Sequence, residues 1–214
     1  MAKLARADQW ITSGSVRYRL LGNPSSPSGI EFGVDYAKAP VPDHYYVADY
    51  FFVESEGSHV LFTFGKLDSP HRGKLRSKIE LYFSPSMFVR QLWGSSRGFH
   101  ETLRKFVQDN GYHRAEGWEE LLEAPKVQTF QSNQVMMVLS EGECVMDFFY
   151  ISPKDIFLKP RRGEGIDLEP LVRIIMAPEL LLGFLDKCEP LAKSLQSKFG
   201  DKNESVESDK AERR

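Results

Sequence analysis

Hydrophobic positions in this chain fall mostly into short runs of alternating or continuous apolar residues. The clearest is YYVADYFFV at residues 45–53, which is rich in aromatic and β-branched side chains and ends at Ser-Glu-Gly. Such a run is typical of a β-strand, and the glycine supplies the positive φ of a tight turn. Val60, Phe62 and Phe64 begin a returning strand. The pattern therefore predicts a β-hairpin, followed by a polar loop at 68–74 and a third strand at 79–83.

The spacing then changes to a helical one. Ser84-Pro85 predicts a helix start, because serine caps the free N–H groups and proline suits the first helical position. Phe88, Leu92 and Trp93 fall on one helical face. The segment GSSRG at 94–98 predicts a kink or break before the helix resumes.

The same order of elements occurs twice. Residues 51–65 align with residues 136–150 at an offset of 85, with six identities in fifteen positions, and residues 81–92 align with 174–185 at an offset of 93. We interpret this as a tandem duplication. The second copy then has a polar loop at 152–165, a third strand at 171–176, and a helix from Pro178 that is interrupted near Pro190.

These elements predict an α+β fold of two tandem strand-strand-strand-helix repeats, whose antiparallel sheets pack against helices. A further strand is expected at 16–20, a loop at 23–29 and a short helix at 117–122. The predicted parts are an N-terminal strand and linker (1–43), repeat 1 (44–108), an acidic connector (109–125), repeat 2 (126–199) and a disordered tail (200–214).

Composition narrows the class of protein. The 28 basic and 30 acidic residues give a formal net charge of −2, so no global positive field attracts nucleic acid or an anionic membrane. The N-terminus, MAKLARADQW, has no apolar signal region, and no apolar run is long enough to span a membrane. Two cysteines, Cys144 and Cys188, form neither a disulfide framework nor a zinc motif. We expect a cytoplasmic protein.

Two segments of each repeat carry a resemblance to a known family. They are HVLFTF (59–64) with SKIELYFSPSMF (77–88), and CVMDFF (144–149) with VRIIMAPELL (172–181). They resemble a short bacterial family of unknown function, present here as two copies. The order of strands and helix also resembles the subunit of the SecB-type export chaperone. That likeness implies a chaperone-like scaffold and transfers no functional residue.

Catalytic motifs are missing from the sequence. There is no G-x-S-x-G nucleophile motif, no paired metal-binding histidines and no phosphate-binding loop. Cys144 lies in an apolar strand, where a core role is favoured over a nucleophilic one. We therefore expect no enzyme, no cofactor and no metal site.

An excess of aromatic residues indicates binding instead. Neighbours such as Phe51 and Phe52 point to opposite faces of a strand, so both faces of the first sheet are apolar. One face packs on the helix, and the other is covered by the second repeat, by another subunit or by a bound chain. The sequence predicts a protein or unfolded polypeptide as partner, with a homo-oligomer as an alternative. The predicted partner-binding residues are Tyr46, Tyr50, Phe52 and Trp93.

A second functional hypothesis rests on two basic segments, residues 66–78 and 154–162. Their cations are candidates for binding an anion or nucleic acid, although charged loops are usually only solvated. The predicted anion-binding residues are Arg72, Lys74, Arg76, Arg161 and Arg162.

Overall fold

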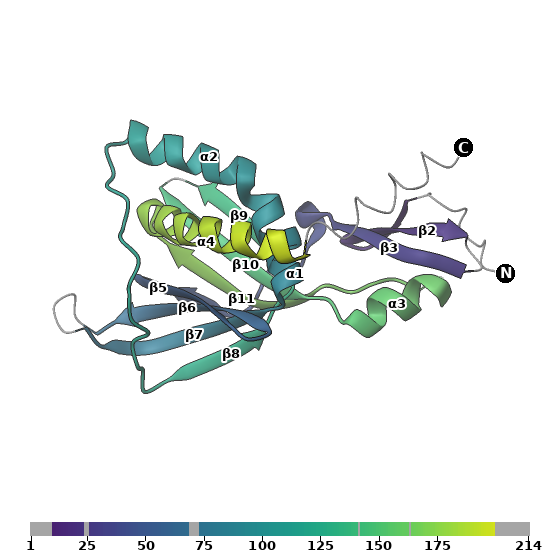
Figure 1. Ribbon diagram of the computed structural model, residues 1–214, viewed down its shortest axis with the longest axis horizontal. Helices are drawn as coiled ribbons and strands as arrows, with labels where there is room; N and C mark the ends of the chain where they lie inside the picture. The colour runs from purple at the N-terminus through teal and green to yellow at the C-terminus, as the bar shows by residue number, and fades with distance from the viewer. Residues whose placement is uncertain (1–9, 24–25, 69–72, 141, 163, 200–214) are drawn as a thin grey trace.

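The computed structural model describes residues 10–23, 26–68, 73–140, 142–162 and 164–199 (Figure 1). The fold is α+β, with three sheets and a set of helices. The predicted tail at 200–214 lies outside the described residues.

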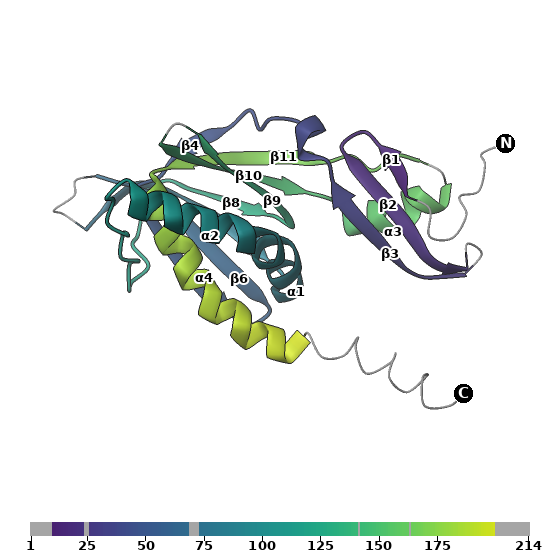
Figure 2. The same ribbon diagram turned by 90° about the horizontal axis from the view of Figure 1, so that it is seen from above.

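A small N-terminal sheet stands at one end of the molecule (Figure 2). Its strands are β1 (Ile11–Ser13), β2 (Val16–Asn23) and β3 (Ser26–Val34). One strand and a loop at 23–29 were predicted; instead β2 runs to Asn23, β3 begins at Ser26, and the two strands pair antiparallel. Helix α3 (Pro153–Arg162) packs with this sheet around Tyr18, Phe149 and Ile156.

The other two sheets have four strands each, and each contains an antiparallel three-strand meander. We name them the β6 sheet and the β10 sheet. The β6 sheet has the order β5 (Tyr50–Glu56), β6 (His59–Leu67), β7 (Leu75–Phe83) and β8 (Val127–Gln131). The β10 sheet has the order β4 (Tyr45–Val47), β11 (Glu169–Met176), β10 (Glu143–Tyr150) and β9 (Gln134–Ser140).

The two sheets exchange their fourth strands. Strand β4 precedes the first meander yet pairs parallel with β11, and β8 precedes the second meander yet pairs parallel with β7. The predicted continuous strand at 45–53 is therefore divided at Ala48 and Asp49, where the chain passes between sheets. Asp49 fixes this passage by accepting a hydrogen bond from the Leu67 N–H (2.6 Å), while the Ala48 N–H bonds Ile175.

The strand pairing does not follow the predicted 85-residue offset. The hairpins close at Glu56 with His59 and at Ser140 with Glu143, so equivalent positions lie 84 residues apart (140 − 56 and 143 − 59). A slip of one residue reverses the face of every side chain in a strand. Val60, which aligns with Val145 in sequence, is accordingly fully buried, whereas Val145 is only partly buried on the opposite face of its sheet. The duplication remains a prediction.

Both predicted helix starts are confirmed, and neither helix is broken where a kink or break was predicted. Pro85 begins a helix whose cap is the Ser84 hydroxyl, and Pro178 begins α4 (Pro178–Phe199), which continues through Pro190. The first helix runs without a break through α1 (Pro85–Met87), the π-helical segment η2 (Phe88–Trp93) and α2 (Gly94–Asp109). The irregularity thus takes the form of a π turn before the glycines.

One core joins the two large sheets and the long helices (Figure 1). Phe184 of α4 lies 5.2 Å, centroid to centroid, from both Phe62 and Phe64, and Phe64 lies 6.0 Å from Phe148 of the other sheet. The inner faces of both sheets are therefore covered within the chain. Their outer faces point away from this core.

The connector at 110–126 contains no helix, so the predicted one at 117–122 is wrong. The connector lies instead against α4 and the start of β5. At Gly183 of α4 an added Cβ atom would lie 2.3 Å from the carbonyl oxygen of Ala115, so only glycine fits this approach. Trp118 packs against Tyr50 at 5.3 Å between ring centroids.

Candidate protein-binding surface

The outer face of the β10 sheet carries an apolar row that crosses all four strands. Register pairs Val47 with Ile175, Ile175 with Val145, and Val145 with Val138. We call these four side chains the apolar row. Directly opposed β-branched side chains on one face contact each other, so the row forms a continuous strip.

This strip is not part of either hydrophobic core of the described residues. Val47 is 52% exposed and Val138 is 40% exposed, while Ile175 and Val145, between them, are half-buried. Tyr45, next to Val47 on the same face, is 73% exposed. Large apolar side chains gathered at the surface, as distinct from single ones, mark interaction sites.

A buried ion pair lies beside the apolar row. Register places Tyr45, Arg173, Asp147 and Met136 side by side in the next row; we call this the charged row. Arg173 donates two hydrogen bonds of 2.7 Å to the two carboxylate oxygens of Asp147, a bidentate pair. Those hydrogen bonds raise the pKa of Arg173. Asp147 is 1% exposed and Arg173 is 29% exposed, so Arg173 is the member of the pair that reaches the surface.

Two of the predicted partner-binding residues are in the interior. Tyr50 is fully buried; its hydroxyl donates to the Glu120 carbonyl and accepts from the Leu122 N–H, both at 3.1 Å. Trp93 is 4% exposed in the main core, 5.8 Å from the His100 ring. Neither residue presents a surface to a partner in this structure, because the connector and the helices cover them.

The other two predicted residues keep some surface. Tyr46 is half-buried, and its hydroxyl donates to the Ser77 carbonyl at 2.7 Å, which ties β4 to β7. Phe52 is half-buried on the outer face of the β6 sheet, opposite Thr63. The four predicted residues therefore do not form one surface.

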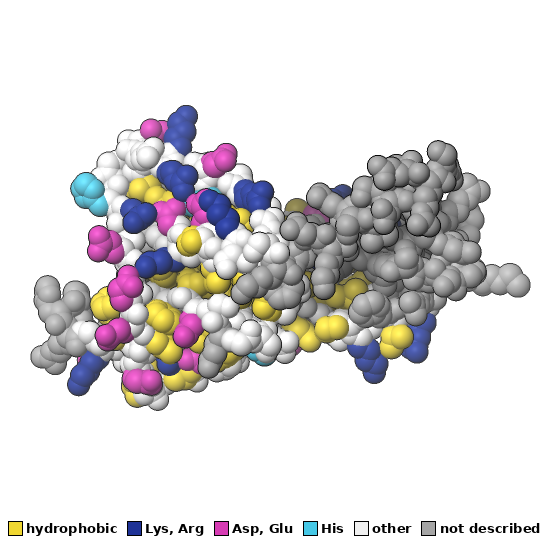
Figure 3. Space-filling view, in the orientation of Figure 1, with side chains coloured by type: hydrophobic (Ala, Val, Ile, Leu, Met, Phe, Trp, Pro, Cys, Tyr) yellow, Lys and Arg dark blue, Asp and Glu magenta, His cyan; other side chains and the backbone are white. Residues whose placement is uncertain are grey.

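The predicted anion-binding residues do not converge either. Arg72 and the side chain of Arg161 lie outside the described residues. Lys74 and Arg76 stand at the start of β7, at the opposite end of the molecule from α3, which carries Arg162 (Figures 1 and 2). Arg76 is bound to Asp68 at 2.8 Å. The segment 154–162 is a helix where a loop was predicted, and acidic and basic side chains are intermixed over α2 and α4 (Figure 3).

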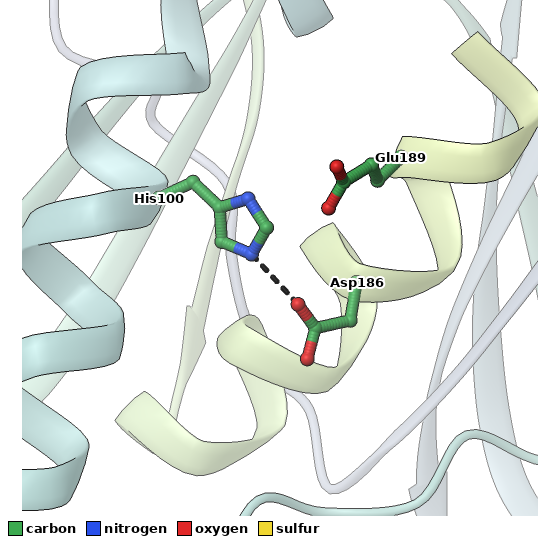
Figure 4. Close-up of side chains that lie close together, drawn as sticks. All are labelled: His100, Asp186 and Glu189. Atoms are coloured by element: carbon green, nitrogen blue, oxygen red, sulfur yellow. Dashed lines mark hydrogen bonds and ion pairs between the residues drawn. The ribbon is translucent and has the colours of Figure 1, made fainter. Parts of the chain in front are cut away.

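A cluster of titratable side chains joins α2 to α4 (Figure 4). His100, Asp186 and Glu189 place one ligand atom each within 4.8 Å of one another, which is the spacing of a metal site. Nε2 of His100 lies 2.8 Å from Asp186, and the same carboxylate also accepts from Arg104 at 3.1 Å and Arg114 at 3.0 Å. Two guanidinium groups on this carboxylate oppose a cation, so the cluster acts as a joint between helices.

The hydrogen-bond partners of Asp186 in this joint favour its charged form. Burial alone raises the pKa of Asp186, but hydrogen bonds from His100, Arg104 and Arg114 outweigh burial and hold the pKa below its ordinary value. Elsewhere, burial followed by the nearby charge of Glu179 raises the pKa of Cys144 to about 12, and burial raises that of Cys188. Neither thiol is ionised at neutral pH, so neither is an activated nucleophile.

Comparison with known proteins gives no relative to this chain: no family model, no curated protein and no solved structure matches it. Among the helices of the described residues, none combines the length and apolarity needed to cross a membrane.

Sequence reasoning missed all four members of the apolar row. The only signal available was the alternation within each strand, which separates the two faces but does not say which face meets the core. In the sequence, Val138 and Val145 align with Val53 and Val60, which pack in the main core. Because the strand pairing is offset by 84 residues, that alignment does not carry the inner face over to Val138 and Val145.

Proposed function

We propose that this chain is a non-enzymatic, cytoplasmic protein-binding module that presents the outer face of its β10 sheet to a polypeptide partner. The observation that carries the proposal is the apolar row: four β-branched residues, one on each strand, belong to neither core of the described residues. Burying such a strip against a partner is favourable by about 25 cal/mol for each Å² of apolar surface removed from water.

The chemistry of the chain supports binding over catalysis. Both thiols are buried with raised pKa values, and the carboxylate of the histidine cluster is already bound by two arginines. A SecB-like scaffold remains a hypothesis from the sequence resemblance. It agrees with an exposed sheet face as the working surface, and it supplies no residue to the proposal.

The experiment compares proteins that co-purify with the tagged full chain and with two single variants, identified by quantitative mass spectrometry. Val47→Asp places a charge in the apolar row. Val127→Asp is the matched control, because Val127 is also an exposed valine (46%) on a parallel edge strand, but of the β6 sheet. We expect polypeptide binding to survive Val127→Asp and to be lost with Val47→Asp. Equal recovery with both variants would refute the proposed surface.

A further inference from the structure

We propose that the free edge of β8, in the β6 sheet, binds an extended segment of a polypeptide partner as an added strand. This site lies on the other large sheet from the apolar row, and it goes beyond the proposed function. It is carried by backbone groups of β8 that point away from the sheet and have no hydrogen-bond partner among the described residues. An added strand supplies N–H and C=O groups at the matching spacing.

The direction of each backbone group follows from two hydrogen bonds at the ends of β8. The Lys78 N–H donates to the Lys126 carbonyl, and the Ser132 N–H donates to the Tyr82 carbonyl. In a parallel pair, every second residue directs both its N–H and its C=O to the neighbouring strand. The even-numbered residues of 126–132 therefore face β7. The residues that face outward, with six backbone groups in all (3 × 2), are Val127, Thr129 and Gln131.

Side chains leave this edge open to water. Along β8 only Phe130 is half-buried, against the main core, and the other residues are exposed, Val127 by 46%. Figure 1 shows β8 at the lower margin of the molecule. An apolar residue of an added strand that lay beside Phe130 would continue the inner face of the sheet. Its burial would add to the free energy gained from the backbone hydrogen bonds.

The other three edges of the two large sheets have the protections that are usual for edge strands. Strand β4 has only three residues. Strand β5 carries the exposed Glu54, and Trp118 of the connector packs on its first residue, Tyr50. On β9, the Val135 carbonyl accepts a hydrogen bond from the Tyr36 hydroxyl at 3.0 Å. Strand β8 has five residues and contains neither a charge nor a proline.

The chemistry of the edge identifies the class of partner. Its binding groups belong to the main chain, so they recognise extended backbone of varied sequence. The side chains of β8 are uncharged, so uncharged and β-branched residues fit beside them. A nucleic acid or a small anion meets no cation on β8 itself. The partner that fits is an extended, unfolded stretch of polypeptide.

The test uses the full chain and a fluorescently labelled peptide of sequence Lys-Thr-Val-Thr-Val-Thr-Lys, with both ends blocked. Six hydrogen bonds of modest net strength, less the cost of ordering the peptide, give a dissociation constant on the order of 100 µM by anisotropy. Amide hydrogen exchange by NMR locates the peptide. We expect slower exchange at Val127, Thr129 and Gln131. No binding up to about 1 mM peptide, or protection only elsewhere, overturns the inference.

A pair of variants tests the backbone directly. The Thr129 N–H points outward, so Thr129→Pro removes a donor from the edge and no hydrogen bond to β7. Thr129→Ala is the matched control, because it keeps the N–H. The dissociation constant should rise at least about tenfold with proline and stay within about twofold with alanine. Equal binding by the two variants overturns the inference. If Thr129→Pro does not fold, by circular dichroism, the exchange pattern of the wild type decides.

A second copy of the chain is the other occupant that could pair with this edge. Sedimentation equilibrium of the wild type and of Thr129→Pro detects it. A wild-type dimer that is lost in Thr129→Pro, together with no peptide binding, overturns the proposed partner.

This inference and the proposed function fail separately. Val47→Asp changes the other sheet and is expected to bind the peptide as the wild type does; loss of peptide binding in that variant overturns the edge as the site. Unchanged co-purification with Val47→Asp refutes only the proposed surface. Val127→Asp keeps all six backbone groups of the edge in place, so it remains the control for the apolar row.

Discussion

The two large sheets have equivalent strand arrangements, but their outer faces carry different side chains. At corresponding heights the β10 sheet has Val47, Ile175, Val145 and Val138, whereas the β6 sheet has Gln131, Tyr82, Leu61 and Glu54. On the β6 sheet the ends of the row are polar and exposed, and the central Leu61 is 6% exposed. On the β10 sheet the ends are apolar and still exposed.

This difference distinguishes residues that the fold requires from residues that the fold leaves free to vary. Both inner faces build the shared core, so their residues are constrained by packing. The residues of an outer face are not constrained by packing in that core. Exposing apolar side chains there to water is unfavourable in free energy. In the corresponding row of the β6 sheet, the two end positions are Gln131 and Glu54, so this arrangement of strands does not itself require apolar side chains there. The apolar row of the β10 sheet is the feature that the proposed partner would cover.

The largest expected effect comes from removing the cation of the ion pair on each outer face. Each outer face has an ion pair, Asp147 with Arg173 on one and Glu80 with Lys78 on the other. Arg173→Met leaves Asp147, 1% exposed, without its partner, and we expect a loss of about 3 kcal/mol in the free energy of unfolding. Lys78→Met leaves Glu80, which is 14% exposed and closer to water, so about 1 kcal/mol is expected.

Urea unfolding measures both values. An equal loss in the two variants would show that the carboxylates are hydrated alike and that the two faces do not differ in this respect.

A second pair of variants tests how far the outer face of each large sheet is exposed to water. Leu61→Ala removes a side chain that is 6% exposed, and about 2 kcal/mol of stability should be lost. Val47→Ala changes a side chain that is 52% exposed, and the loss should stay below about 0.5 kcal/mol. Thermal unfolding of the dilute chains checks this order. A cost for Val47→Ala that matched Leu61→Ala would mean that the apolar row is already covered within the chain.

The joint between the helices should contribute to the loss of stability in acid. The pKa of Asp186 is lowered in the folded chain, so this carboxylate contributes stability above its ordinary pKa of about 3.9, and the contribution is lost as pH falls through the lower folded value. Asp186→Asn should cost about 1 to 2 kcal/mol at pH 7 and flatten the fall in stability below about pH 4.

Denaturation curves at pH 7 and at several acid values measure this slope. Val127→Ala leaves the joint intact, adds no titrating group, and is the control for handling and fold. An acid slope in Asp186→Asn equal to that of the wild type would assign the response to other carboxylates.

Much of this fold was predictable because local signals agreed with it. The Ser84-Pro85 helix start, the hairpin turns and the three-strand meanders follow from capping, turn and alternation rules that act within a few residues. The two predicted helix breaks failed because tertiary packing outweighs local propensity. The helix containing Gly94 and Gly98, and α4 with Pro190, are held by the core that they help to form.

The candidate surface was not predictable for a different reason. The exchange of β4 and β8 between the sheets depends on contacts between segments that are distant in sequence. No residue pattern near Tyr45 indicates that this residue pairs with Arg173. Tyr50 and Trp93 were predicted to bind a partner because they are aromatic, a property that equally favours burial. Only the three-dimensional register places Val47, Ile175, Val145 and Val138 in one line.

The smallest expected effect concerns β4, the edge strand of the β10 sheet that a tyrosine side chain ties to the β6 sheet. Tyr46 points inward from β4 and donates its hydroxyl to the Ser77 carbonyl of β7 at 2.7 Å, whereas its neighbour Tyr45 is 73% exposed. Tyr46→Phe removes that hydrogen bond and leaves the carbonyl of half-buried Ser77 with one partner fewer, for which about 1 kcal/mol is expected. Tyr45→Phe is the matched control and should change stability by less than about 0.3 kcal/mol. If urea unfolding shows the two variants to be equally stable, β4 is not held by the β6 sheet, and the β10 sheet would have to position its exposed edge unaided.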